Sequence, residues 1–322
     1  MKLTARRRQQ QVGRVRYPNH AGKESLFAFP FSVRGHLVGV DLNSAEISRA
    51  VRAALAEDLG SGDVTTLATV PATARSIACM NAREPLTVTG LRFAVCAFRQ
   101  LSPKVRIQEL VSDGNHIPAG ATLLKISGPS RAILSAERVA LNFVQRLSGV
   151  ATATAQFVEA IAGGRTKILD TRKTTPGWRR FEKYAVACGG GLNHRMGLYD
   201  LVLIKDNHLA ALRDEKPNAI AAAVARARKK FPRLRVEVEA DTLEQAAQAA
   251  DAGADIILLD NLSPAQLRRA VKIIAGRAQT EASGGVNLKT VRAIARTGVD
   301  FISVGAITHS ARAVDVGLDF IE

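Results

Sequence analysis

Basic residues follow a series of short apolar runs in the second half of the chain. They are Arg172 and Lys173 after KILD, Lys205 after LVLI, and the neighbouring pair His194 and Arg195. A guanidinium group can bind a carboxylate or a phosphate through two parallel hydrogen bonds, and lysine adds a compact positive charge. Side chains of this kind, if they met at one site, would hold anionic substrates.

Carboxylates and glycines at the later runs add a second kind of chemistry. Glu239 lies in RVEVE on the same strand face as Glu237, and Asp260 follows IILL. Their oxygens suit sugar hydroxyl groups, or a hydrated Mg²⁺ that also contacts substrate phosphates. Ser283-Gly284-Gly285 and Gly305 lie between strand-like runs and helical segments, where free backbone N–H groups commonly hold phosphate.

No pattern indicates a catalytic nucleophile. Cys188 precedes Gly189-Gly190-Gly191, which we interpret as a flexible substrate loop rather than a reactive-cysteine motif. His194, in GGGLNHR, is an equal candidate for a structural and a substrate-binding role. The other histidines are interpreted as surface or structural residues: His20, His36, His116, His208 and His309. The predicted chemistry is therefore the electrostatic positioning of two anionic reactants together with a metal ion.

The elements that must position these residues are strands alternating with amphipathic helices. Six apolar runs occur in residues 166–322, and the last four begin near residues 235, 256, 279 and 301, at spacings of 21, 23 and 22 residues. A strand and its crossover helix need this length, so parallel strands are predicted. We favour a complete or incomplete β/α barrel, with a doubly wound open sheet as the alternative. In a barrel, the residues above would converge at the carboxyl ends of the strands.

Residues 41–150 are predicted to form a separate mixed α/β domain. Asn43 and Glu46 form a capping pair at the start of a helix. Strands are expected around 77–82, 86–88, 105–111 and 122–126, and a helix near 91–101. A long helical pattern begins at Ser130 and would link this domain to the barrel domain, residues 151–322, with a break near Ser148-Gly149.

The composition is globular but has a large excess of positive charge. The length of 322 residues suggests about two domains. With 47% hydrophobic and 23% charged residues, a mostly disordered chain is excluded. Three separated cysteines exclude a disulfide framework, and no apolar run is long enough to span a bilayer. The net charge of +16 indicates an anionic partner, namely nucleic acid, a membrane surface or an acidic small substrate.

The charge has two sources along the chain. Residues 1–40 contribute +7, and the segment 160–210, which contains the basic residues described above, contributes +5. We predict that residues 1–40 are a loosely ordered, solvated extension, with a transit peptide or a nucleic-acid-binding tail as alternatives. A nucleic-acid-binding protein is the alternative function of a different class. Aromatic residues are only 5%, and no basic–aromatic motif supports it.

The segment TKILDTRKTTPGWRRFEKYAVACGGGLNHRMGLYDLVLIKDNH resembles the quinolinate phosphoribosyltransferase family, the decarboxylating nicotinate-nucleotide pyrophosphorylases. ERVALNFVQRLSGVAT before it, and VEVEADTLEQA, LLDN, EASGG and SVGAITH after it, extend the resemblance over residues 41–322. The resemblance implies an amino-terminal α/β sandwich and an incomplete parallel α/β barrel. It also implies a Mg²⁺-dependent enzyme of NAD biosynthesis that joins quinolinate to phosphoribosyl pyrophosphate and releases pyrophosphate and CO₂. We expect a cytoplasmic homodimer or higher homo-oligomer.

The resemblance implies roles for single residues as well. Arg138 would reach the active site of a neighbouring subunit. The cations that would hold the two carboxylates of quinolinate are Arg138, Arg172, His194, Arg195 and Lys205. Phosphoribosyl pyrophosphate and its Mg²⁺ would be held by Lys173, Glu239, Asp260, Ser283, Gly284 and Gly305, with Glu239 and Asp260 on the metal side. Glu237 is a candidate for a supporting role, and Trp178, Arg179 and Arg180 receive none. A related transferase with another anionic ring substrate is the nearest alternative, and the number of retained cations argues against it.

Overall fold

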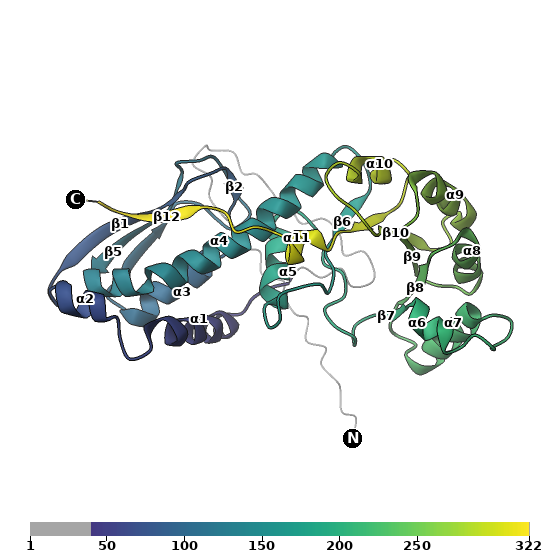
Figure 1. Cartoon of the computed structure of the whole chain (residues 1–322), viewed down its shortest axis with the longest axis horizontal. Helices are drawn as coiled ribbons and strands as arrows, with labels where there is room; N and C mark the ends of the chain where they lie inside the picture. The colour runs from purple at the N-terminus through teal and green to yellow at the C-terminus, as the bar shows by residue number, and fades with distance from the viewer. Residues whose placement is uncertain (1–39, 322) are drawn as a thin grey trace, which may run out of the picture. The chain divides into compact units, whose positions relative to one another are not determined.

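The computed structural model describes residues 40–321, which form an antiparallel sheet, a parallel sheet and the helices that cover them (Figure 1). The predicted extension lies outside the described residues, apart from Val40. In the described chain, no helix combines the length and the apolar character needed to cross a membrane.

The antiparallel sheet has the strand order β12-β1-β5-β3. Its strands are β1 (Arg75–Ala82), β3 (Arg106–Glu109), β5 (Thr122–Pro129) and β12 (Val316–Ile321). A separate pair joins β2 (Leu86–Thr87) to β4 (His116–Ile117). The helices of this half are α1 (Ser44–Leu59), α2 (Val64–Thr69) and α3 (Leu91–Leu101). The capping pair of Asn43 and Glu46 is confirmed, since each side chain accepts a hydrogen bond from the other residue's backbone N–H.

The helix α4 (Ser130–Ala160) runs without interruption for 31 residues, so the predicted break near Ser148-Gly149 is wrong. A glycine is required there for a different reason. A Cβ atom at Gly149 would lie 2.0 Å from the carbonyl oxygen of Arg312, because the segment before β12 passes directly against the helix. Ser148 is also in use, since its hydroxyl donates to Thr89 O at 3.0 Å and accepts from Thr89 N at 2.8 Å.

The parallel sheet contains all six predicted strands, in the order β6-β11-β10-β9-β8-β7. They are β6 (Lys167–Leu169), β7 (Val202–Ile204), β8 (Val236–Ala240), β9 (Ile256–Asp260), β10 (Gln279–Ser283) and β11 (Phe301–Ser303). From β7 to β11 each strand pairs with the next in the chain, and β6 pairs with β11. In the described chain β6 and β7 do not pair, so the barrel is incomplete. The order does not reverse, which excludes the doubly wound alternative.

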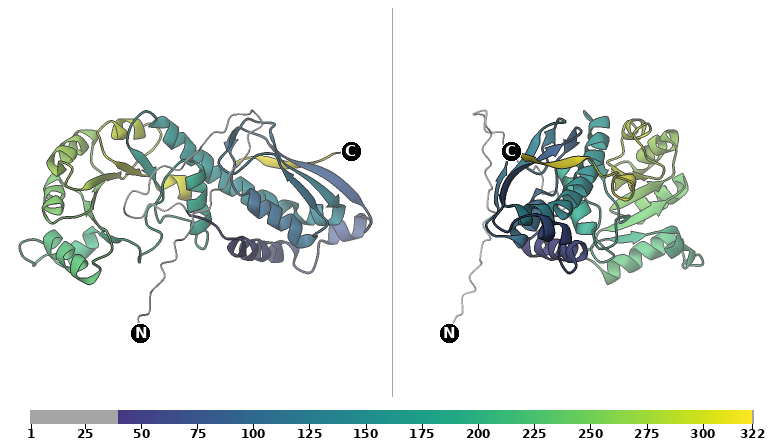
Figure 2. Two further views of the ribbon diagram at one scale, coloured as in Figure 1. Left: turned by 180° about the vertical axis from the view of Figure 1, so that it is seen from behind. Right: turned by 60° about the vertical axis from the view of Figure 1, so that its left-hand side comes forward.

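Helices follow the strands of the parallel sheet as expected for crossover connections. They are α5 (Arg179–Cys188), α6 (Asp206–Ala210), α7 (Ala219–Lys230), α8 (Leu243–Asp251), α9 (Pro264–Ile274), α10 (Val291–Ala295) and α11 (Ala306–His309). Figure 2 shows α7, α8 and α9 along one face of the curved sheet. Small apolar residues such as Ala246 and Ala249 are fully buried and allow close packing of α8. The other face of the sheet carries polar residues, among them Glu237 of β8 and Glu281 of β10.

The strand β12 leaves the parallel sheet and pairs antiparallel with β1, with Ile77 opposite Ile321 and Ala82 opposite Val316. Residues 316–321, which the sequence analysis placed with the rest of 151–322 in the barrel, therefore belong to the first sheet. This pairing is invisible to local patterns, because it joins segments from distant parts of the chain. The boundary near residue 150 falls inside α4, which contacts elements of both halves.

Candidate active site

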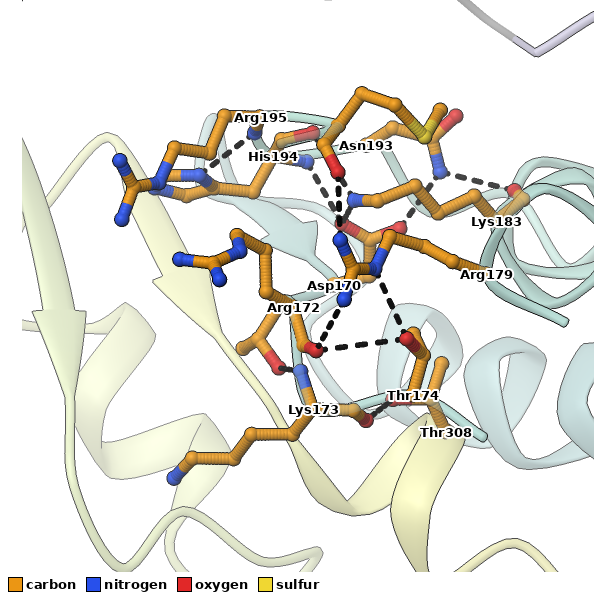
Figure 3. A network of polar contacts seen from close by, with 12 residues as sticks. Asp170, Arg172, Lys173, Thr174, Arg179, Lys183, Asn193, His194, Arg195 and Thr308 are labelled. Atoms are coloured by element: carbon orange, nitrogen blue, oxygen red, sulfur yellow. Dashed lines mark hydrogen bonds and ion pairs between the residues drawn. The ribbon is translucent and has the colours of Figure 1, made fainter. Parts of the chain in front are cut away.

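Two arginines lie near each other at the carboxyl ends of the parallel strands (Figure 3). Arg172 follows β6, and Arg195 lies in the segment between α5 and β7. Burial lowers the pKa of Arg195, and the positive charge of Arg172 lowers it further. Among the described residues, Arg172 Nε is buried without a hydrogen-bond partner, and the guanidinium group of Arg195 donates only to Leu201 O, at 3.3 Å. No carboxylate among residues 40–321 forms an ion pair with either arginine, so both are available to bind an external anion.

His194 lies against two buried carboxylates from alternate strands, Glu237 of β8 and Glu281 of β10. Its Nε2 atom is 3.1 Å from Glu237 Oε2 and 3.5 Å from Glu281 Oε2. Its Nδ1 atom accepts a hydrogen bond from Arg195 N at 2.7 Å. Burial alone would lower the pKa of His194, but the two carboxylates outweigh it and raise the pKa to about 9. In the neutral ring, the bond from Arg195 N leaves Nε2 as the proton-bearing atom, and Nε2 faces the carboxylates.

The carboxylates of Glu237 and Glu281 are short of hydrogen-bond donors. All four of their oxygens are buried, and apart from the ion pairs with His194 they have no hydrogen-bond partner within residues 40–321. Burial and the charge of Glu237 raise the pKa of Glu281 to about 7, against the opposing effect of His194. One atom from each of the three residues lies within 4.8 Å of the others, a spacing that a metal ion could also use. A proton on Glu281 would also relieve the repulsion between the two carboxylates. The sequence did not predict that these three residues form a cluster.

The carboxylates predicted to face the phosphorylated sugar lie on adjacent strands. Glu239 of β8 forms an ion pair with Lys205, which follows β7. Asp260 ends β9 and accepts a hydrogen bond from Asn261 Nδ2 at 2.6 Å. In the register of β8 and β9, Glu239 pairs with Leu258, so Asp260 is two residues further along its strand. Both side chains therefore belong to the same end of the parallel sheet, as the sequence predicted.

Glycines allow close approach at the ends of β9, β10 and β11. Gly284 has a φ of 94°, and a Cβ atom there would lie 2.1 Å from Asn261 Oδ1. A Cβ atom at Gly305 would lie 3.1 Å from Lys173 Cδ, so the Lys173 side chain passes directly over this glycine. Ser283 and Gly284 are thus adjacent to the end of β9, and Lys173 lies beside Gly305. Phosphate binding by these residues stays a prediction.

Arg138 stands apart from the other predicted residues. It is exposed on α4, and in the described chain no hydrogen bond or ion pair joins it to them. Arg146 lies two turns further along α4, about 12 Å away, and donates to Glu182 and to Thr308 O. The exposure of Arg138 leaves its guanidinium group free to contact another molecule.

A polar network that the sequence analysis did not select holds the segments bearing the cations (Figure 3). The buried ion pair of Asp170 and Lys183 is its centre. Asp170 accepts from His194 N at 2.7 Å and from Asn193 Nδ2 at 2.8 Å, and Lys183 Nζ donates to His194 O at 3.0 Å. Burial raises the pKa of Asp170 and lowers that of Lys183, and their mutual attraction opposes both effects.

The three residues left without a role by the sequence analysis are now placed. Trp178 stacks on Phe143 of α4, with ring centroids 5.0 Å apart. Arg180 pairs with Glu46 and donates to Asp41 O at 3.0 Å, away from the strand ends. Arg179 instead donates to the segments that bear the site residues. The spacing of Arg179 and Lys183, which places both on one helical face, was the available signal.

The absence of a predicted nucleophile agrees with the environment of Cys188. Burial raises the pKa of this thiol to about 12, so it stays protonated at neutral pH. The described site consists of cations, of which Arg172 and Arg195 have no carboxylate partner among residues 40–321, together with two strand-end carboxylates and glycine-rich backbone. Such an arrangement binds anions and stabilises developing charge.

Comparison with known proteins identifies the family of the chain. Residues 63–148 match the family described as quinolinate phosphoribosyl transferase, N-terminal domain, and residues 150–319 match its C-terminal domain. The nicotinate-nucleotide pyrophosphorylase [carboxylating] of Mycobacterium leprae is 43% identical over 84% of this chain and 95% of its own length. The chloroplastic enzyme of that name from Arabidopsis thaliana is 40% identical over 85% and 82%.

Solved structures agree. The nicotinate-nucleotide pyrophosphorylase of Francisella tularensis has a TM-score of 0.83 and 42% identity, and the match covers 88% of this chain and 99% of that one. The chain therefore belongs to the quinolinate phosphoribosyltransferase family.

Proposed function

We propose that this member of the quinolinate phosphoribosyltransferase family joins quinolinate to phosphoribosyl pyrophosphate and releases nicotinate mononucleotide, pyrophosphate and CO₂, a step of NAD biosynthesis. One observation carries the proposal: the guanidinium groups of Arg172 and Arg195 lie near each other with no carboxylate partner in the described chain. A planar ring with two adjacent carboxylates supplies the missing charge. The names of the curated relatives describe the same activity.

Quinolinate is held by its two carboxylates. Arg172 and Arg195 supply paired N–H donors, and Lys205 adds positive charge from the end of β7. His194 contributes through its position, because its Nδ1 atom accepts from Arg195 N and fixes the backbone there. These contacts hold the ring in one orientation, with its nitrogen toward the sugar, and thereby lower the entropic cost of the reaction.

Phosphoribosyl pyrophosphate is held at the ends of β6, β9, β10 and β11. Lys173 and the backbone N–H groups near Ser283, Gly284 and Gly305 face its phosphate oxygens. The ring nitrogen of quinolinate attacks C1 of the ribose as the bond to pyrophosphate breaks. Positive charge develops on the ribose, and Glu239 or Asp260 stabilises it.

Loss of CO₂ follows from the bond just formed. Once the ring nitrogen is quaternary, its positive charge stabilises the electron pair that departing CO₂ leaves on the adjacent ring carbon. A proton then replaces CO₂ at that carbon. Solvent water can supply this proton.

The donor set fits Mg²⁺. Glu239 and Asp260 offer carboxylate oxygens from adjacent strands, the ligands that Mg²⁺ uses together with water and substrate phosphates. Lys205 neutralises Glu239 when no cation is present. Bound Mg²⁺ would offset negative charge on the pyrophosphate leaving group. Glu239 and Asp260 are the residues that would hold it, directly or through water.

Assembly as at least a homodimer completes the site. Arg138 is exposed and unpaired in the described chain, and in the family resemblance it serves the neighbouring subunit. Leu198 and Tyr199, three and four residues after Arg195, are 74% and 73% exposed. Apolar side chains of that size beside the site are suited to cover by a partner. A cytoplasmic location and a solvated arm at residues 1–40 stay predictions.

The proposed activity is tested by mixing the full chain with Mg²⁺, quinolinate and phosphoribosyl pyrophosphate and measuring nicotinate mononucleotide and CO₂. Product is expected with quinolinate and not with nicotinate, which lacks the second carboxylate. No turnover, or equal turnover of nicotinate, contradicts the proposal. Omission of Mg²⁺ with a chelator present is expected to abolish turnover, and its return to restore it.

The shared site is tested by subunit mixing. Arg138→Ala and Arg172→Ala are each expected to be inactive alone. A heterodimer of the two retains one site with both arginines, so mixing restores part of the activity. Absence of rescue, when heterodimers have been demonstrated, contradicts the contribution of Arg138 to the partner's site.

A further inference from the structure

The guanidinium group of Arg179 joins two segments that are separate in sequence. Its Nε atom donates to Thr174 Oγ1 at 3.0 Å, and one terminal nitrogen donates to Met196 O at 3.1 Å. The other terminal nitrogen donates to Arg172 O at 3.4 Å. The first segment bears Arg172 and Lys173, and the second bears His194 and Arg195. Figure 3 shows Arg179 between them.

Arg179 is placed by the amino terminus of α5, directly after Trp178. Lys183, one turn later on the same helix face, bonds to Asp170 and to the His194 carbonyl. Glu182 receives the Thr175 N–H at 3.0 Å and the Thr175 hydroxyl at 2.8 Å. This helix therefore holds both segments, through Lys183 at Asp170 and His194 O and through Arg179 at Arg172 O and Met196 O.

The contacts of Arg179 separate it from the substrate-binding cations. Its three nitrogen atoms are all engaged with protein oxygens, whereas Arg172 Nε has no partner. The planar guanidinium group can address three acceptors in fixed directions, which a lysine ammonium group cannot do in the same geometry. Its role is geometric rather than direct charge recognition of substrate.

We call the link that Arg179 forms between the two segments a clamp. It is needed because the two substrate-binding arginines repel each other. The charge of Arg172 lowers the pKa of Arg195, which is the sign of two cations held close together. Without an anion between them, relaxation of either segment would move the guanidinium groups apart. Asp170 ties the segments at their buried base through His194 N, and Arg179 ties them further along, at Arg172 O and Met196 O.

We propose that Arg179 is a positioning residue that fixes the separation of Arg172 and Arg195 to fit two adjacent carboxylates on one ring. The inference rests on the proposed function. It assigns Arg179 to the selection of a dicarboxylate, and it assigns no contact of Arg179 with substrate. Phosphoribosyl pyrophosphate is held mainly at the ends of β9, β10 and β11, and only Lys173 among its contacts lies in a segment that Arg179 bonds, so it depends less on this clamp.

The test compares Arg179→Met with Arg180→Met, a neighbour of the same type whose contacts lead to Glu46 and Asp41. KM and kcat are measured for quinolinate and for phosphoribosyl pyrophosphate, and Tm for each variant. Arg179→Met is expected to raise the KM for quinolinate about tenfold or more, the cost of one to three lost hydrogen bonds. The KM for phosphoribosyl pyrophosphate is expected to change by no more than about threefold. Arg180→Met is expected to leave both KM values unchanged.

The variant Arg179→Lys tests whether a raised KM for quinolinate results from loss of folding. Lysine keeps the positive charge but lacks the planar guanidinium group and its three directed N–H donors. The KM for quinolinate is therefore expected to stay raised while Tm stays close to that of the wild type. Equal changes in both KM values, or a fall in Tm with unchanged KM values, overturn the inference. Failure of the wild type to turn over quinolinate refutes the proposed function instead. Restoration of the wild-type KM by lysine shows that charge suffices and also overturns the clamp.

Discussion

Glu281 makes the stability of the protein depend on pH, and Glu281→Gln measures how strongly. Burial and the charge of Glu237 raise the pKa of Glu281 from 4.5 to about 7. Below the lower value both folded and unfolded chains are protonated, and the carboxyl costs nothing. Between the two values the folded state binds more protons than the unfolded state, so stability falls as pH rises.

The magnitude follows from the shift. One pKa unit corresponds to about 1.4 kcal/mol, so the ionised carboxylate costs the folded state about 3 kcal/mol above pH 7. Glutamine cannot ionise and is free of this cost. His194 acts in the same direction, because its raised pKa gives stability that is present below pH 6.5 and lost as pH rises through about 9. Removal of Glu281 weakens that contribution as well.

The assay is urea unfolding of wild type and variant between about pH 5 and about pH 8, followed by circular dichroism and by the fluorescence of Trp178, the single tryptophan. The free energy of unfolding of Glu281→Gln, relative to wild type, is expected to rise by about 3 kcal/mol over this range. Gln279→Ala, an uncharged change on the same strand, is expected to differ from wild type by a constant amount. A constant difference for Glu281→Gln too would refute the reasoning.

Two further predictions concern the frame of the site. Asp170→Asn leaves Lys183 buried without its carboxylate, which should cost about 3 kcal/mol or more and lower Tm by roughly 6 °C or more. The double variant Asp170→Asn/Lys183→Met should regain part of the lost stability. If thermal unfolding shows no regain, the role of the buried pair is contradicted. Gly149→Ala should destabilise the protein by about 1–3 kcal/mol, because the new Cβ meets the Arg312 carbonyl oxygen at 2.0 Å. Helix propensity alone would give a gain of about 1 kcal/mol, so the sign of the change in urea unfolding decides between the two effects.

Local patterns were sufficient for the strands of the parallel sheet and for the residues at their ends. Apolar runs predicted each of the six strands, the last four of them at a regular spacing, and the position of Glu239 and Asp260 follows from strand geometry. Local patterns failed where an explanation depended on a distant segment. Gly149 looked like a helix break, but the reason for its presence is Arg312, which contacts the helix from the other end of the described chain.

The supporting residues were missed for a related reason. Glu281 reads as part of a strand followed by Gly284, and only the fold brings it to His194 and Glu237. Arg179 and Arg180 are indistinguishable by type, and their contacts diverge because they lie on different faces of α5. The residue types indicated an anion-binding site. Only the tertiary structure distinguishes the cations without protein partners from the residues that hold other segments in place.

The pairing of β12 with β1 also sets an order of events during synthesis. The strand β1 has one of its two neighbours only after residues 316–321 have left the ribosome, which is after every strand of the parallel sheet has been made. Until then β1 is an open edge, the kind of surface that pairs with other chains. The helix α4 and the parallel sheet can form earlier, so the first sheet is begun first and finished last.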